Sequence, residues 1–283
     1  MSFETRSTVT GLIDESSRRV VRELPREAGW LLLASLPLRF LEAQMLTRAA
    51  SLEPEAGTQG AWAYLGTLSF LVTLALVPAL WARLVFVHAA TAARAGRFRE
   101  EAGPVRRVPR VRAASFVGAL VLTLAAQALL YWGAVTFLAV ALALVLAALA
   151  AAAAPYFQDV EPWRAWRELG RSVPPFRIAL GLVVIFTLAL AIVLINLFVG
   201  FQFLSWLATA VVPGFDEAWW SAVLAPGNQA FVYLLWAGGL LLVEPFWLAA
   251  WSAAVGDRRA RDTGDDLAAW FGELRVAGRE RAS

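Results

Sequence analysis

Long apolar segments alternate with short charged stretches along most of this chain. Six such segments can be distinguished, and most of them reach the roughly 20 residues that a helix needs to cross a hydrocarbon core about 30 Å thick. The pattern therefore predicts an all-α fold, an integral membrane bundle of six transmembrane helices. The expected spans are residues 28–45, 61–88, 113–132, 134–154, 178–200 and 229–254.

The third and fourth spans share one uncharged stretch, residues 113–157, which is too long for a single crossing. The natural turn lies around Gly133. In the fourth span, small residues recur at every fourth position, which lets a neighbouring helix approach closely. This stripe predicts helix packing rather than chemistry, and it consists of Ala139, Ala143, Ala147 and Ala151.

Arginine is distributed unevenly between the two sides of the predicted bundle. Residues 89–112 and 155–177 are rich in arginine, as are both ends of the chain, whereas the opposite loops hold Arg48 beside two glutamates, and then Asp216 and Glu217. Because arginine-rich loops stay inside, the pattern predicts a protein of the cytoplasmic (inner) membrane with both termini cytoplasmic. The chain then divides into a cytoplasmic amphipathic N-terminal helix (1–27), a six-helix transmembrane domain (28–256) and a cytoplasmic C-terminal tail (257–283).

Three flanking segments show the periodicity of amphipathic interfacial helices. The second is residues 162–173, where Trp163, Trp166 and Val173 are expected to face lipid, and the third follows Asp216, an expected N-cap. Each is interpreted as a connector or, alternatively, as a docking site for a partner. A further amphipathic helix is expected in the tail around Trp270. In the first segment, the expected apolar face is Val9, Leu12, Ile13, Val20, Val21 and Leu24, opposite Arg18, Arg19 and Arg22.

The amino-acid composition supports a membrane protein and excludes several kinds of catalytic site. Hydrophobic residues make up 59% of the chain and charged residues 17%, so lipid must solvate much of the surface. Cysteine is absent and all 25 basic residues are arginine, which excludes a thiolate nucleophile, a P-loop lysine and a Schiff-base lysine. The net charge of +3 is modest, and the arginines are placed as in membrane loops. We therefore expect membrane lipids, and no nucleic acid, as partners.

Arg39, Glu42 and Glu244 lie inside predicted spans, where an ionisable group is costly and needs a partner. Arg39 and Glu244 are each about ten residues from the cytoplasmic end of their spans, so both lie about 15 Å deep. The first and sixth spans run in opposite directions, so these two side chains are expected to meet. Glu42 is the rival partner of Arg39 at i, i+3 spacing. The group is interpreted as a structural pair or, alternatively, as a proton or substrate site.

The chain lacks the usual constellations of catalytic residues. His88 is the single histidine, and no metal-binding, phosphate-cradling or nucleophile-elbow motif is present. For an intramembrane enzyme only Glu42, Glu244 and Asn196 remain as candidates. The sequence therefore predicts no enzymatic activity, no cofactor and no metal site.

The residues after the sixth span resemble the closing motif of a bacterial family of multi-pass membrane proteins. That family is related to the membrane domain found beside some glycerophosphodiester phosphodiesterases. In this chain Val255, Arg258 and Thr263 replace the tyrosine, leucine and glutamate of the motif. The resemblance implies a membrane protein without phosphodiesterase chemistry, often a partner of other envelope proteins. The matching residues are Asp257, Arg259, Arg261, Gly264, Asp266 and Leu267.

Three functions are compatible with these features. The first is a non-catalytic membrane subunit or scaffold of an envelope-associated complex, with a protein partner or self-association in the membrane. The second is a transporter or permease with a polar site near mid-membrane, because Arg39, Glu244 and nearby prolines lie where carriers bind substrates. The third is an intramembrane enzyme. The first is our leading hypothesis, since the catalytic inventory is empty.

Overall fold

The computed structural model describes residues 8–51, 59–97, 113–132, 137–157, 165–212 and 216–263, and every regular element within these ranges is a helix. The all-α expectation is confirmed for this part of the chain. The elements are α1 (Val9–Arg22), α2 (Pro25–Ser51), α3 (Gln59–Arg97), α4 (Ala113–Trp132), α5 (Phe137–Ala153), the 3-10 helix η1 (Ala154–Phe157), α6 (Ala165–Ser172), α7 (Phe176–Val211), α8 (Glu217–Val223) and α9 (Gln229–Thr263).

Three helices in the described part of the chain are long and apolar enough to cross a membrane. They are formed by Gly66–Ala93 in α3, by the whole of α7 and by Gln229–Asp262 in α9. The other predicted spans correspond to α2, α4 and α5, which are not among these three. The helices thus indicate a membrane protein, while the number of six crossings stays a prediction.

Two helices continue well beyond the ends expected from the apolar pattern. α7 reaches Val211 rather than residue 200, and α9 reaches Thr263 rather than residue 254. In α7, residues 201–211 contain no proline or glycine that would stop the helix. In α9, the residues after 256 are polar, which ends the apolar segment, but they do not disfavour a helical backbone, so the helix continues to Thr263. The expected turn at Gly133 and tail helix around Trp270 lie outside the described residues.

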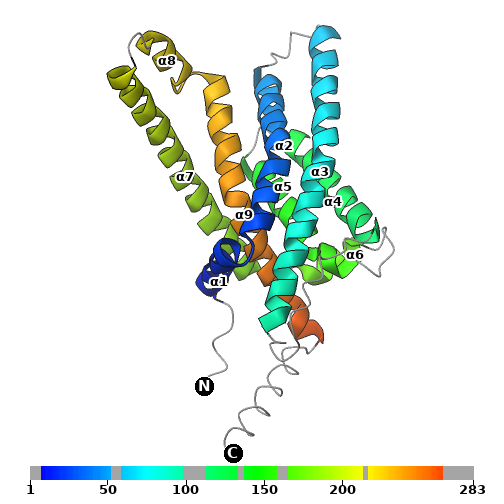
Figure 1. Ribbon diagram of the computed structural model, residues 1–283. Coiled ribbons are helices and arrows are strands. Elements are labelled where there is room, and N and C mark those ends of the chain that lie inside the picture. Colours follow the sequence, from blue (N-terminus) through cyan, green and yellow to red (C-terminus); the bar gives the residue numbers. More distant parts are fainter. Residues whose placement is uncertain are drawn as a thin grey trace, which may run out of the picture.

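α9 is the central helix of the bundle. It contacts α1, α2, α3, α5, α6 and α7. In Figure 1, α2 and α3 run beside it, α7 lies on the outside of the bundle, and α8 joins α7 to α9 at the upper end. α1 and α6 lie toward the lower end, where α9 also finishes. The two ends of the bundle therefore carry different short helices.

One large core in the lower part of the bundle gives way to two smaller cores above it. The large core draws on every helix except α8, with much of it alanine from α5 and α9. Further up, Leu38 packs with Val72 and Leu76 between α2 and α3. Separately, Leu224 and Phe231 pack with residues of α7. The bundle thus divides into an α2–α3 arm and an α7–α8–α9 arm.

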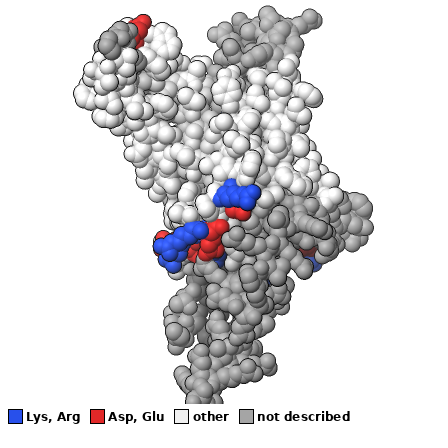
Figure 2. Space-filling view, in the orientation of Figure 1, with Lys and Arg blue, Asp and Glu red and all other residues white. Residues whose placement is uncertain are grey.

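α7 presents most of its surface to the outside. Only 17% of its most apolar stretch is buried, against 44% for α3 and α9. The exposed side chains continue along its length, including Leu188, Ile195 and Phe203. Figure 2 shows charged side chains near the lower part of the visible face and an almost uncharged surface above them. Such a surface matches a lipid environment better than water.

α1 packs onto the bundle with most of the expected apolar face, since Leu12, Val20 and Leu24 are buried and Val9 and Ile13 pack against the core, but two residues differ from the expectation. Leu12, Ser16, Arg19 and Val20 are buried, whereas Val21 is 65% exposed. The assignment of Val21 to the apolar face and of Arg19 to the polar face was therefore wrong. Contacts with α9, α2 and α7 select the buried face, and Arg19 is accommodated there because it pairs with Glu15 one turn earlier.

The other two interfacial segments follow the expected pattern more closely. Asp216 caps α8, since its side chain accepts a hydrogen bond from the backbone N–H of Trp219 at 2.9 Å. The predicted N-cap is thus confirmed. In α6, Trp166 is exposed and Leu169 faces the bundle. Val173, directly after the end of α6, is also exposed. Trp163 lies outside the described residues.

Candidate functional site

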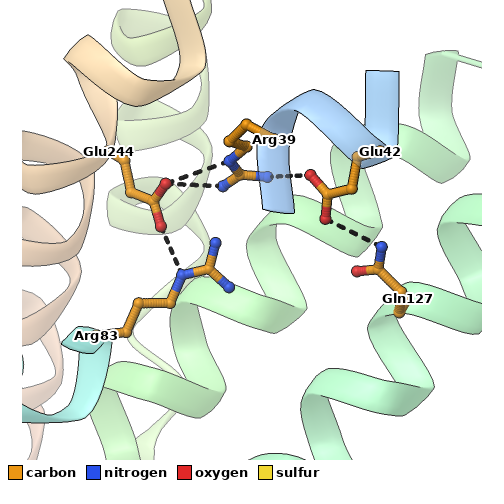
Figure 3. Close-up of polar contacts among 5 residues, drawn as sticks. All are labelled: Arg39, Glu42, Arg83, Gln127 and Glu244. Atoms are coloured by element: carbon orange, nitrogen blue, oxygen red, sulfur yellow. Dashed lines mark hydrogen bonds and ion pairs between the residues drawn. The ribbon is translucent and has the colours of Figure 1, made fainter. Parts of the chain in front are cut away.

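Five polar side chains from four helices meet inside the bundle (Figure 3). α2 supplies Arg39 and Glu42, α3 supplies Arg83, α4 supplies Gln127 and α9 supplies Glu244. We call this group the polar cluster. It lies near the level at which the single large core divides into the two arms.

Arg39 connects the two carboxylates of the polar cluster. Its Nε and Nη2 donate to one oxygen of Glu244 at 3.2 and 3.1 Å, and its Nη1 donates to Glu42 at 2.7 Å. All three guanidinium nitrogens therefore bind a carboxylate. The planar fork of arginine makes this possible, and a lysine could not reproduce it.

The remaining carboxylate oxygens are also engaged. Arg83 Nε donates to the second oxygen of Glu244 at 2.5 Å, and Gln127 Nε2 donates to the second oxygen of Glu42 at 3.0 Å. Each of the four carboxylate oxygens thus accepts at least one hydrogen bond. Two arginines balance two glutamates, so the polar cluster has no net formal charge.

The polar cluster is almost fully removed from solvent. The side chains of Arg39, Glu42, Arg83 and Glu244 are 10%, 8%, 6% and 4% exposed. Buried charges lose their hydration, and only good pairing offsets that cost. Removal of any one charge would leave its partners buried without compensation, so the four charges act as one unit.

Each helix that supplies a charge also contains a proline close to it. Pro37 precedes Arg39 in α2, Pro78 precedes Arg83 in α3, and Pro245 directly follows Glu244 in α9. A proline inside a helix removes one backbone hydrogen bond and favours a bend. The three charged helices are therefore weakened at about the depth of the polar cluster.

The structure brings Arg39, Glu42 and Glu244 together and adds two residues that sequence reasoning missed. Glu42 and Glu244 are joint partners of Arg39 rather than rivals. Arg83 could have been found from the sequence, since it is an arginine inside a predicted span and needs a partner there as Glu244 does. For Gln127 the sequence signal was weaker, because a single amide side chain in an apolar helix is common and does not by itself indicate a polar contact.

Arg259 of the tail motif forms a second contact site at the lower end of the bundle. Its Nη2 donates to the backbone oxygen and the carboxylate of Glu168 at 2.8 and 2.7 Å, and its Nε donates to Ser172 Oγ at 3.0 Å. The guanidinium also lies 5.0 Å from the ring centre of Tyr156. Arg259 therefore fixes α6 and η1 against the end of α9.

The other residues of the tail motif are less informative. Asp257 and Arg261 lie in the last two turns of α9, and Gly264, Asp266 and Leu267 lie outside the described residues. The end of α9 thus belongs to the packed bundle up to Arg259 at least, several residues into the segment expected to be a free tail.

The remaining candidates for chemistry bond to their own helices. His88 Nδ1 lies 2.8 Å from the backbone oxygen of Leu84, and Asn196 Nδ2 donates to that of Ile192 at 2.8 Å. Within the described residues, no group of three or more histidine or acidic side chains could hold a metal ion. Asn196 therefore lies outside the polar cluster.

Comparisons with protein families, curated proteins and solved structures found no match to this chain. The resemblance of the tail motif to the bacterial membrane family therefore stays a hypothesis.

We predict that Glu244→Gln lowers the free energy of unfolding in detergent by roughly 3–5 kcal/mol, because Arg39 and Arg83 would lose their buried counter-charge. Arg171→Gln is the matched control, since Arg171 is 70% exposed in its pair with Glu168 and should change stability by less than about 1 kcal/mol. Thermal unfolding of the purified variants measures both effects. Wild-type stability of Glu244→Gln would contradict the role of the polar cluster in holding the helices together.

A second prediction compares trypsin cleavage of α6 in variants of two neighbouring residues, Arg258 and Arg259. Arg259→Gln removes charge-assisted hydrogen bonds worth roughly 1.5–3 kcal/mol and should release α6, so that trypsin cleaves after Arg167 and Arg171 about tenfold faster. Arg258 is 42% exposed and pairs with Asp262 within α9, so Arg258→Gln should leave this rate near wild type. Equal cleavage rates in the two variants would show that Arg259 does not hold α6.

Proposed function

We propose that this chain is a non-catalytic, multi-pass membrane subunit that serves as a scaffold for another membrane protein or for a second copy of itself. The observation that carries the proposal is the closure of the polar cluster, in which every carboxylate oxygen is already bound by arginine or glutamine. A general acid or base needs access to a reacting group. Carboxylates held in this way are better suited to joining helices.

The long outer helix supports the same proposal. α7 has 36 residues and is about 54 Å long, which exceeds a hydrocarbon core of about 30 Å. Much of this length is apolar and exposed. A helix that is anchored mainly to α9 and open on its other sides offers a surface to a neighbouring membrane protein.

The topology that we propose has six crossings with both termini in the cytoplasm. It is supported by the arginine-rich segments on one side of the expected spans. The placement of α1, α6 and the end of α9 toward one end of the bundle, and of α8 at the other, is compatible with it (Figure 1). Arg106, in the most arginine-rich of these segments, lies outside the described residues.

The topology predicts opposite accessibility for two introduced cysteines. Because the chain has no native cysteine, Arg106→Cys and Asp216→Cys each provide a single thiol. An impermeant thiol reagent should label Asp216→Cys in intact cells, and should label Arg106→Cys only after the cells are opened. The reverse pattern would overturn the proposed orientation.

Photo-crosslinking along α7 tests the scaffold itself. A photoreactive amino acid at the exposed position Ile195 or Phe203 should crosslink to another protein chain in native membranes, whereas one at the buried Leu182 should react only within its own chain. The captured chain should also co-purify, at a constant ratio, with tagged wild-type protein. Adducts with lipid alone at both exposed positions, and no co-purifying chain, would remove the scaffold function.

A transporter or permease is the second candidate. It is favoured by the three prolines that lie close to the charges in α2, α3 and α9, since interrupted helices commonly surround the binding sites of carriers. Transport of a solute by the purified protein in liposomes would support this alternative.

A further inference from the structure

Arg83 uses less of its hydrogen-bonding capacity than Arg39. Its Nε binds Glu244, but its Nη2 is fully buried and has no hydrogen-bond acceptor among the described residues. Arg39, in contrast, donates through all three nitrogens. In Figure 3 only Nε of Arg83 is joined to Glu244, and neither terminal nitrogen is bonded to any of the residues drawn.

A buried guanidinium donor without an acceptor is unfavourable, and the penalty is larger for charged groups than for neutral ones. The terminal nitrogens of arginine match the two oxygens of a carboxylate or phosphate group. We propose that the terminal nitrogens of Arg83 bind a ligand that carries such an oxyanion, while Nε continues to hold Glu244. This binding site goes beyond the scaffold function and does not depend on it.

The prolines near the polar cluster provide a reason for a ligand to enter there. Pro78 lies five residues before Arg83, and Pro37 and Pro245 lie close to Arg39 and Glu244. Helices bend most easily where a backbone hydrogen bond is missing. A bend at these points would move the helices around Arg83 apart.

The charges of the polar cluster determine whether a proton must bind together with the ligand. The charged groups that face one another are Arg39 and Glu42 from α2, Arg83 from α3 and Glu244 from α9, with the neutral Gln127 from α4. Their charges already cancel, so a bound anion would leave one excess negative charge in a dry interior. We therefore expect a monoanion to bind together with one proton, which Glu42 or Glu244 accepts. No covalent bond in the ligand changes.

The test uses the full chain in a non-ionic detergent that contains no phosphate. Thermal unfolding is followed by tryptophan fluorescence, with 13 tryptophans as reporters, during titration with sodium acetate, sodium phosphate or, at equal ionic strength, sodium chloride. A separate arm compares phosphatidic acid with diacylglycerol in the micelles, which distinguishes a lipid headgroup from a free anion. We expect a saturable rise of about 3 °C with at least one oxyanion and none with chloride or diacylglycerol.

Two lysine variants locate the binding site. Arg83→Lys keeps a positive charge for Glu244 but lacks the second donor pair, so the rise should disappear. Arg171→Lys, at an arginine that is 70% exposed and lies outside the polar cluster, is the control and should keep it. A rise that persists in Arg83→Lys would overturn the proposal, as would an equal response to chloride or no response to any oxyanion.

Proton uptake by the wild-type protein provides a measurement that does not depend on the folding of any variant. In weakly buffered solution, addition of the active oxyanion should remove about one proton from solution for each ligand bound. Its affinity should fall about tenfold for each unit of pH increase, as linkage requires for one coupled proton. Binding without proton uptake would contradict the proposed charge balance.

Discussion

Charge neutralisation in a dry interior is the constraint on which this bundle depends. Arg39, Arg83, Glu42 and Glu244 come from three helices, and none of them could stay buried without the others. Apolar side chains alone select helix packing weakly in lipid, because lipid tails are as apolar as leucine. The polar cluster supplies the missing selectivity, since only one register of α2, α3 and α9 brings all four charges into contact.

The position of the polar cluster explains the shape of the bundle around it. Below it, alanines of α5 and α9 pack into one core. Above it, the α2–α3 arm and the α7–α8–α9 arm have separate cores. The bonds from Arg39 and Arg83 to Glu244 join the first arm to the second near this division. The arms can therefore differ in position at their upper ends while the lower part of the bundle stays fixed.

The sequence predicted the helices better than it predicted their ends and faces. Long apolar runs located α3, α7 and α9, and the rule that buried charges need partners brought Arg39 to Glu244. Arg83 lies nearer the end of its predicted span, where a long side chain can reach the interface, so the same rule predicts a buried partner for it less strongly. In α1, periodicity predicted most of the buried face but not Arg19, which is buried by contacts with distant helices and pairs with Glu15. The contact of Arg259 with α6 likewise joins segments far apart in sequence, so no local sequence pattern predicts it.

The central place of α9 has a consequence for biosynthesis. Glu244, which holds both buried arginines, belongs to the last described helix and so leaves the ribosome after all the others. Until then Arg39 has only Glu42 of its own helix as a partner, and Arg83 must stay hydrated, bind to headgroups or be sheltered by the insertion machinery. The earlier helices therefore cannot reach their final packing while translation continues. A nascent chain that stops before α9 would leave Arg83 without its counter-charge, which is a feature by which membrane proteases could distinguish incomplete chains from finished ones.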